Sequence, residues 1–267
     1  MRDFLIEFLK AYPSIPSHAL WRAIEAKLLF NEHFEYPLLD LACGDGLSGR
    51  TIFADKEGKI IFGCDISNEC VAKAKLYTDI YKSVEVADGR CLPYKDNQFA
   101  TVLSNCVLEH IPEDYKVLRE VSRVLRENGR FIFTVPSENF VNNLRTQDKN
   151  FVENLNKRLE HFHYRSPQEW ERLLEECGLT LEKFRYYLPP VVQKVWEELL
   201  GFETKKLMGR ELGAILGSKK IGMWYITRLL YPIIFNRALR RQYLMGTSDN
   251  RKGGALLIIA RKVRCDL

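Results

Sequence analysis

The spacing of apolar residues changes from a helical to a strand period near residue 36. Apolar residues recur at helical spacing from Ala19 to Phe30, which predicts helices over 3–11 and 18–30. Short apolar runs then alternate with helical patterns, and this alternation predicts an α/β fold with a mostly parallel sheet covered by helices on both faces. Seven strands are expected, at 37–41, 59–64, 84–87, 100–103, 130–135, 179–188 and 254–262.

A long segment, 189–253, separates the last two predicted strands. Helical patterns over 191–200, 206–216 and 221–245 predict that it is a helical insertion, and 140–159 is expected to form a further covering helix. The expected organisation is an N-terminal helical cover, a sheet core, the insertion, and a last core strand with a tail, at 1–36, 37–188, 189–253 and 254–267.

Composition excludes several classes of protein. Hydrophobic residues make up 46% of the 267 residues, which is enough for a sizeable core and excludes a disordered chain or a coiled coil. No apolar run is long enough for a polytopic membrane protein. The seven cysteines show neither zinc-knuckle spacing nor a disulfide framework. Two acids, Asp3 and Glu7, lie within the first seven residues, which does not fit a signal peptide, so a cytoplasmic location is expected.

The formal charge of +5 is unevenly distributed. Residues 205–264 contain 14 Lys or Arg and only two acids, Glu211 and Asp249, so this segment carries +12 and the rest of the chain −7. A basic C-terminal quarter on an acidic body predicts an anionic partner surface.

Glycine or polar residues follow four consecutive predicted strands. In open α/β sheets, ligands bind beyond the carboxyl ends of the strands, a glycine turn lets backbone approach a ligand, and an acid after the second strand can bind ribose hydroxyls. Each strand end alone could be turn or capping chemistry, but four together predict a ligand site. They are Asp40–Gly46, Cys64–Asp65, Ala87–Gly89 and Ser104–Asn105.

A nicotinamide dinucleotide site is the competing interpretation. It requires Gly-x-Gly-x-x-Gly, whereas this chain has Ala42, Gly44 and Gly46 in the first turn, with Gly49 three residues later. Residues 137–267 contain no matching glycine turn, so a second nucleotide-binding half is not expected.

Residues 38–46 resemble the first motif of class I S-adenosylmethionine-dependent methyltransferases. Asp65 is similar to their ribose-binding acid, 87–89 to their adenine segment, and 105–111 to the fourth-strand motif of the small-molecule branch, which includes ubiquinone- and menaquinone-type enzymes. The resemblance covers about 36–188 and resumes in the last strand. It implies a Rossmann-like seven-stranded sheet, with S-adenosylmethionine as the cofactor.

The resemblance also implies which residues contact this cofactor. Gly44 and Gly46 would face the methionine moiety, Asp65 the ribose and Asp88 the adenine amine, while Asn105 would line the methyl-transfer end. Ala42 stands where the family most often has glycine, and Ala100 replaces the usual aspartate after Phe99. The full set of expected contacts is Asp40, Ala42, Gly44, Gly46, Asp65, Ile66, Asp88, Gly89 and Asn105.

Catalysis requires little beyond orientation, because a sulfonium methyl group is already activated, although a hydroxyl acceptor also needs a base. His110, His161 and His163 are the candidate bases, with roles in turns and loops as the structural alternative. No metal is expected, because no Asp, Glu or Cys lies at companion spacing to the His161-x-His163 pair.

The predicted insertion indicates where the protein could meet its methyl acceptor. Residues 221–235 are almost wholly apolar, with Lys219 and Lys220 before them and Arg237, Arg240 and Arg241 after them. They are too short to span a bilayer of about 30 Å. The sequence leaves open a helix lying on an anionic membrane surface through 205–245, a buried cap helix, and an apolar acceptor tunnel.

The sequence therefore predicts methyl transfer from S-adenosylmethionine to an oxygen or carbon of a small hydrophobic or lipid-linked acceptor, by a cytoplasmic protein that can be peripheral on the membrane. The alternatives are an RNA or tRNA methyltransferase that uses the basic C-terminal region, and a non-catalytic partner subunit with this fold. Against nucleic acid, Asn105 is followed by Cys-Val-Leu rather than by the Pro-Pro-aromatic motif of the family's nucleic-acid amine methylators.

Overall fold

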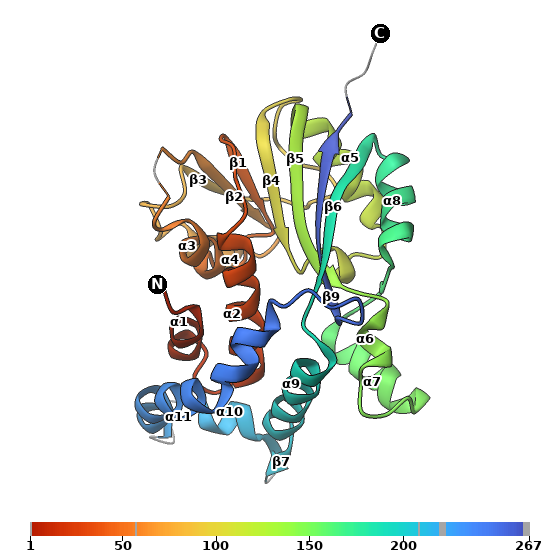
Figure 1. The fold of residues 1–267 in the computed structure, drawn as a ribbon. Helices are drawn as coiled ribbons and strands as arrows, with labels where there is room; N and C mark the ends of the chain where they lie inside the picture. Colours follow the sequence, from red (N-terminus) through yellow and green to blue (C-terminus); the bar gives the residue numbers. More distant parts are fainter. Residues whose placement is uncertain (1, 57, 208, 219–222, 264–267) are drawn as a thin grey trace.

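A seven-stranded sheet with the order β3-β2-β1-β4-β5-β9-β6 forms the centre of the molecule (Figure 1). The computed structural model describes residues 2–56, 58–207, 209–218 and 223–263, with 223–227 described by their backbone alone. Neighbouring strands are parallel, except that β9 is antiparallel to both β5 and β6. The strands are β1 Leu38–Leu41, β2 Ile61–Asp65, β3 Ser83–Val86, β4 Phe99–Asn105, β5 Leu125–Pro136, β6 Leu179–Tyr187 and β9 Ala255–Lys262. The predicted α/β class and mostly parallel sheet are confirmed.

Helices cover both faces of the sheet. Successive side chains of its central strands therefore pack alternately into two apolar cores. Leu38 packs in one core with Phe53 of α3 (Leu47–Phe53) and with α4 (Asn68–Ala74). Leu39 packs in the other with Val117 of α5 (Asp114–Val124) and Trp170 of α8 (Pro167–Glu175). Strands buried on both faces read as continuous apolar runs, which explains why the strand pattern was visible in the sequence.

The strand register brings the polar strand ends together. Leu41, the last residue of β1, is paired with Cys64 of β2 and with Ser104 of β4. The residues that follow these positions therefore start at one edge of the sheet. This edge is where ligands bind in open α/β sheets.

Helices from the two ends of the chain gather beside the sheet (Figure 1). The N-terminal α1 (Phe4–Ala11) and α2 (Pro16–Phe30) lie with α9 (Pro190–Glu203), α10 (Leu212–Leu216) and α11 (Met223–Gly246). A buried contact joins α2 to α9. The backbone N–H and the hydroxyl of Ser17 both donate to the Glu203 carboxylate, at 2.7 and 2.6 Å.

Two expected helices differ from the structure. Residues 140–159 form two helices, α6 (Asn139–Asn142) and α7 (Lys149–Leu159), and α7 begins where the Asp148 carboxylate accepts a hydrogen bond from the Phe151 N–H at 2.9 Å. The expected helix over 206–216 opens instead with a short hairpin, β7 (Lys206–Leu207) and β8 (Arg210–Glu211), before α10. The division of the chain at residues 36, 188 and 253 stays a prediction.

Part of the predicted apolar and basic segment lies outside the described residues, namely 219–222 and the side chains of 223–227. Within the part of the chain that the structure describes, no helix is both long enough and apolar enough to cross a membrane.

Candidate functional site

The turn after β1 depends on left-handed backbone at three alternate residues. Ala42, Gly44 and Gly46 have φ of 55°, 58° and 81°. A Cβ on Gly46 would come within 3.0 Å of Tyr77 and Ala74, so glycine is required there by packing. A Cβ on Gly44 would meet nothing within 4 Å. The turn therefore presents bare backbone toward open space at Gly44.

Asp65, the last residue of β2, holds this turn in place. One carboxylate oxygen accepts a hydrogen bond from the Gly44 N–H at 2.9 Å, and the other accepts one from the Ser67 N–H at 2.9 Å. Each carboxylate oxygen has a further lone pair, so Asp65 can also accept hydrogen bonds from a ligand.

A cavity of about 330 Å³ lies at the carboxyl ends of β1, β2 and β3. It brings together five of the residues predicted from the sequence: Ala42, Ile66, Asp88, Gly89 and His110. The rest of the described lining is mainly apolar, with Leu41, Ala87, Arg90, Val107, Ile111, Pro112 and Val117. The predicted residues Asp40, Gly44, Gly46, Asp65 and Asn105 are not among those that line it.

Asp40 is buried beneath the turn. Its carboxylate accepts a hydrogen bond of 2.6 Å from the Tyr81 hydroxyl, and burial raises its pKa to about 7, against the opposing effect of that bond. A Cβ on Gly49 would collide with this pair, at 2.0 Å from the Tyr81 oxygen. In this structure Asp40 supports the turn from below.

Asp88 is paired with Arg90, whose Nη2 lies 2.7 Å from a carboxylate oxygen. These hydrogen bonds lower the pKa of Asp88 and keep it ionised. Arg90 also lies 3.2 Å from the Glu113 carboxylate. A base amine that binds Asp88 would have to share it with Arg90.

A second cavity, of about 230 Å³, lies between α2 and the carboxyl end of β4. Its wall includes three aromatic rings in mutual edge contact, with centroids 5.2–6.1 Å apart, from Trp21, Phe140 and Trp196. Polar groups converge on the same space, from His18, Arg22, Glu109, His110 and His161. His110 lines both this cavity and the first one.

A fully buried carboxylate, Glu25, joins α2 to the sheet at this cavity. One oxygen accepts hydrogen bonds from Trp21 Nε1, Tyr187 Oη and Cys106 Sγ, and the other accepts one from Arg22 at 2.9 Å. Arg22 also donates to the Asn105 backbone carbonyl at 3.3 Å. Sequence analysis missed Glu25 and Glu109. For Glu25 the signal in the sequence was an acid on an apolar helix face. For Glu109 it was an acid four residues after the buried strand β4.

The two cavity-lining histidines have fixed ring orientations. The His110 Nδ1–H donates to the Glu160 carbonyl at 3.2 Å, and the His161 Nδ1 lies 3.1 Å from the Tyr164 hydroxyl, which itself donates to Asn156. Burial lowers the pKa of His110, and it lowers the pKa of His161 to about 3. Both imidazoles are therefore neutral near pH 7, with Nε2 as the acceptor nitrogen.

The remaining predicted residues have structural partners. His163 lies 3.0 Å from the Ile111 carbonyl and 3.3 Å from Arg165, outside the two cavities. The side-chain oxygen of Asn105 accepts a hydrogen bond of 2.6 Å from the Thr134 hydroxyl. Cys106, which follows it, has a φ of 52°, so left-handed backbone outside glycine occurs at the ends of both β1 and β4.

Comparison with known proteins identifies a methyltransferase domain within the chain. Residues 39–133 match the family model described as "Methyltransferase domain". A demethylmenaquinone methyltransferase of Lactococcus lactis is 32% identical over 130 residues, which cover 46% of this chain and 51% of that protein. A sarcosine/dimethylglycine N-methyltransferase of Halorhodospira halochloris is 36% identical over 106 residues, or 38% of each chain. The match thus spans about half the length of such relatives or less.

Solved structures share the fold over nearly the whole chain. A geranyl diphosphate methyltransferase in complex with S-adenosylmethionine has a TM-score of 0.58 at 17% identity, covering 93% of this chain and 90% of its own. The [4+2]-cyclase SpnF has a TM-score of 0.56 at 16% identity, covering 93% and 82%. At such identities the likeness concerns the fold. The chain therefore carries a methyltransferase domain over residues 39–133, within a fold that it shares with these structures.

Proposed function

We propose that the protein transfers a methyl group from S-adenosylmethionine to an oxygen or carbon of a small, largely apolar acceptor. The observation that carries this proposal is the position of His110, which lines both the cavity beside the glycine turn and the aromatic cavity under α2. A methyl donor in the first cavity and an acceptor in the second would meet at this residue.

We base the cofactor assignment on the first cavity together with the adjoining turn at Gly44 and with Asp65, two residues that do not line the cavity. The open space at Gly44 is where a ligand could contact backbone directly, and Asp65 beside it has lone pairs for ribose hydroxyls. Asp88 and Gly89 line the cavity at the end of β3, where an adenine amine would meet the carboxylate. Leu41, Ile66 and Val107 supply apolar surface for the base. Asp40 is assigned a supporting role below the turn.

S-Adenosylmethionine supplies an activated methyl group, so the chain has to orient the acceptor, exclude water and accept a proton where the acceptor is a hydroxyl. His110 is the residue proposed to accept that proton. Its Nδ1–H is used by the Glu160 carbonyl, and its lowered pKa keeps Nε2 unprotonated near pH 7. Trp21, Phe140 and Trp196 would hold an apolar or planar acceptor.

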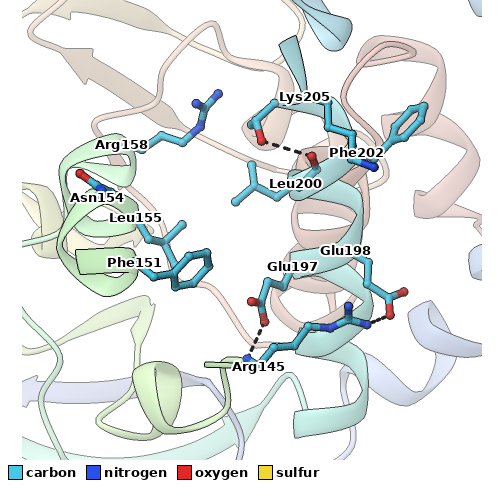
Figure 2. A pocket seen from close by; sticks show the side chains of 12 residues that line it. Arg145, Phe151, Asn154, Leu155, Arg158, Glu197, Glu198, Leu200, Phe202 and Lys205 are labelled. Carbon is cyan, nitrogen blue, oxygen red and sulfur yellow. Dashed lines mark hydrogen bonds and ion pairs between the residues drawn. The ribbon is translucent and has the colours of Figure 1, made fainter. Parts of the chain in front are cut away.

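The acceptor space extends away from the cofactor. The aromatic cavity shares His18, Leu159 and Trp196 with a neighbouring one of about 230 Å³. This neighbouring cavity in turn shares Arg158, Leu200 and Thr204 with a larger cavity of about 560 Å³ between α7 and α9 (Figure 2). This succession supports an elongated acceptor, such as one with a lipid tail.

The far cavity has a mixed wall. Figure 2 shows Phe151 and Leu155 of α7 facing Leu200 of α9, while Arg145 reaches Glu197 and Glu198 along one side. The Arg145 N–H donates to Glu197 at 3.0 Å, and its guanidinium forms an ion pair with Glu198.

Two experiments test the proposal. Calorimetry with S-adenosylhomocysteine is expected to give saturable binding to the folded protein, and absence of heat at high micromolar ligand would contradict the cofactor assignment. Labelled S-adenosylmethionine is then incubated with the protein and a cell extract, which is separated into lipid, other small-molecule, protein and RNA fractions. Label in the lipid or small-molecule fraction is the expected result. Label confined to protein or RNA would overturn the acceptor class, and no label anywhere would favour the non-catalytic alternative.

A further inference from the structure

We propose that Glu109, His110 and His161 form a binding site for a divalent transition-metal cation such as zinc. One carboxylate oxygen and one nitrogen of each imidazole lie within 4.8 Å of one another. Two imidazoles and a carboxylate that converge in this way are the donor set of many three-ligand zinc and iron sites. The proposal concerns cation binding and does not depend on methyl transfer. With a cation bound, His110 Nε2 would be its ligand, and this nitrogen could accept a proton only in the cation-free protein.

One oxygen of the Glu109 carboxylate is buried without a hydrogen-bond partner. Glu109 is only 1% exposed, and its Oε2 atom is buried with no hydrogen-bond partner. Its other oxygen, Oε1, lies 3.8 Å from His110 Nε2, which is too far for a hydrogen bond. A buried carboxylate oxygen without a partner is costly, and a cation between these atoms would satisfy it.

Both histidines are oriented for ligation by a second layer of contacts. The His110 Nδ1–H donates to the Glu160 carbonyl, and the His161 Nδ1–H to the Tyr164 hydroxyl, which is itself anchored on Asn156 at 2.7 Å. Metal-ligating histidines are held in this way in proteins, with the other nitrogen left to donate its lone pair. His163, the neighbour at i+2, faces Ile111 and Arg165 and takes no part.

The surroundings allow a cation to enter and to keep an open coordination position. His110 and His161 also line a cavity of about 570 Å³, whose wall contains Glu153 and Glu160. All three ligands line the aromatic cavity, so the fourth position would face that space. The nearby positive charge of Arg22 is met by Glu25 at 2.9 Å. Three protein ligands with an open position are typical of catalytic rather than structural zinc sites.

Zinc titration of the chelator-treated full chain, in competition with a chromophoric chelator, tests this site. One zinc ion per chain is expected with an affinity in the micromolar range or tighter. Glu109→Gln and His161→Gln should each weaken binding about tenfold or more, whereas His33→Gln, which changes an exposed histidine outside the cluster, should not. Cobalt substitution should give visible absorption bands that the two cluster variants lose.

Thermal unfolding of each variant without metal establishes that it is folded. The proposal would be overturned if the parent protein bound zinc no more tightly than the folded Glu109→Gln and His161→Gln variants do. It would also be overturned if only His33→Gln weakened zinc binding. Neither result would bear on S-adenosylhomocysteine binding, which is measured without metal. A failure of the cation site is therefore distinguishable from a failure of the proposed function.

Discussion

The guanidinium of Arg22 lies 2.9 Å from the carboxylate of Glu25, one turn farther along α2. The Glu25 side chain is fully buried, while the Arg22 side chain is 22% exposed and lines the aromatic cavity. The pair connects the N-terminal cover to the end of β4 through the Asn105 carbonyl and Cys106. The cover is therefore tied to the site by charge as well as by apolar packing.

Glu25→Ala is expected to lower the free energy of unfolding by about 3–5 kcal/mol, because it leaves Arg22 and three buried donors without their acceptor. Glu25→Gln retains an acceptor oxygen and should cost less. Urea unfolding of both variants provides the measurement. A loss below about 1 kcal/mol for the alanine variant would show that the pair contributes little.

Asp65→Ala is expected to weaken S-adenosylhomocysteine binding by about tenfold or more, since it removes both the acceptor for ribose hydroxyls and the anchor of the Gly44 N–H. Calorimetry on the folded variant gives the affinity. Asp79→Ala, which alters an exposed acid outside the site, serves as the matched control and should bind as the parent does. Equal affinities for the two variants would contradict the ribose role.

Two glycines of one turn are expected to respond differently to the same substitution. Gly44→Ala places a methyl group in open space, so it should cost about 1–2 kcal/mol of stability through its positive φ but weaken S-adenosylhomocysteine binding strongly. Gly46→Ala also meets Tyr77 and Ala74, and should cost about 2–5 kcal/mol. Chemical unfolding and calorimetry on both separate the effects. If Gly44→Ala destabilised the protein more than Gly46→Ala does, the packing role of Gly46 would be contradicted.

The sequence predicted the sheet well because its strands are buried on both faces, and it predicted the polar strand ends because they follow those strands directly. It could not predict Glu109 as a neighbour of His161, since 52 positions separate them and only the turn after α7 brings them together. Nor could it predict the partner of Asp40, because Tyr81 approaches from the segment before β3. The break between α6 and α7 depends on a local capping bond at Asp148, which an apolar stripe does not reveal.

The buried Asp40 should make stability depend on pH. Burial raises its pKa from an ordinary value of 3.8 to about 7, so between these values the folded protein binds more protons than the unfolded chain. The contribution of this group to the free energy of unfolding therefore falls as pH rises from about 4 to about 7, by on the order of a few kcal/mol.

Asp40→Asn can still accept the Tyr81 hydrogen bond but cannot ionise, so it should weaken this pH dependence. Urea unfolding of the parent and the variant at pH 5 and pH 8 provides the comparison. The variant is expected to gain stability relative to the parent at the higher pH. A stability difference that is the same at both pH values would show that Asp40 has no raised pKa in the folded protein.

The helix α11 is expected to bind anionic membranes through an apolar face with adjoining cations. Leu229 and Ile233, four residues apart and therefore on one face, are 69% and 67% exposed, and Arg237 and Arg241 continue along the helix. Apolar burial in the lipid interface combined with attraction to anionic headgroups would give salt-sensitive binding. The protein should therefore float with vesicles that contain phosphatidylserine but not with purely zwitterionic ones.

A double variant, Leu229→Gln with Ile233→Gln, should reduce the vesicle-bound fraction about tenfold or more, because each side chain contributes on the order of 1.5–3 kcal/mol when buried. Leu76→Gln changes a similarly exposed leucine near α4, at 78% exposure, and should leave flotation unchanged. Flotation in raised salt measures the electrostatic part. Equal flotation of both variants, or flotation that does not depend on headgroup charge, would contradict a membrane role for α11. It would leave α11 as a helix packed on α1 and α2.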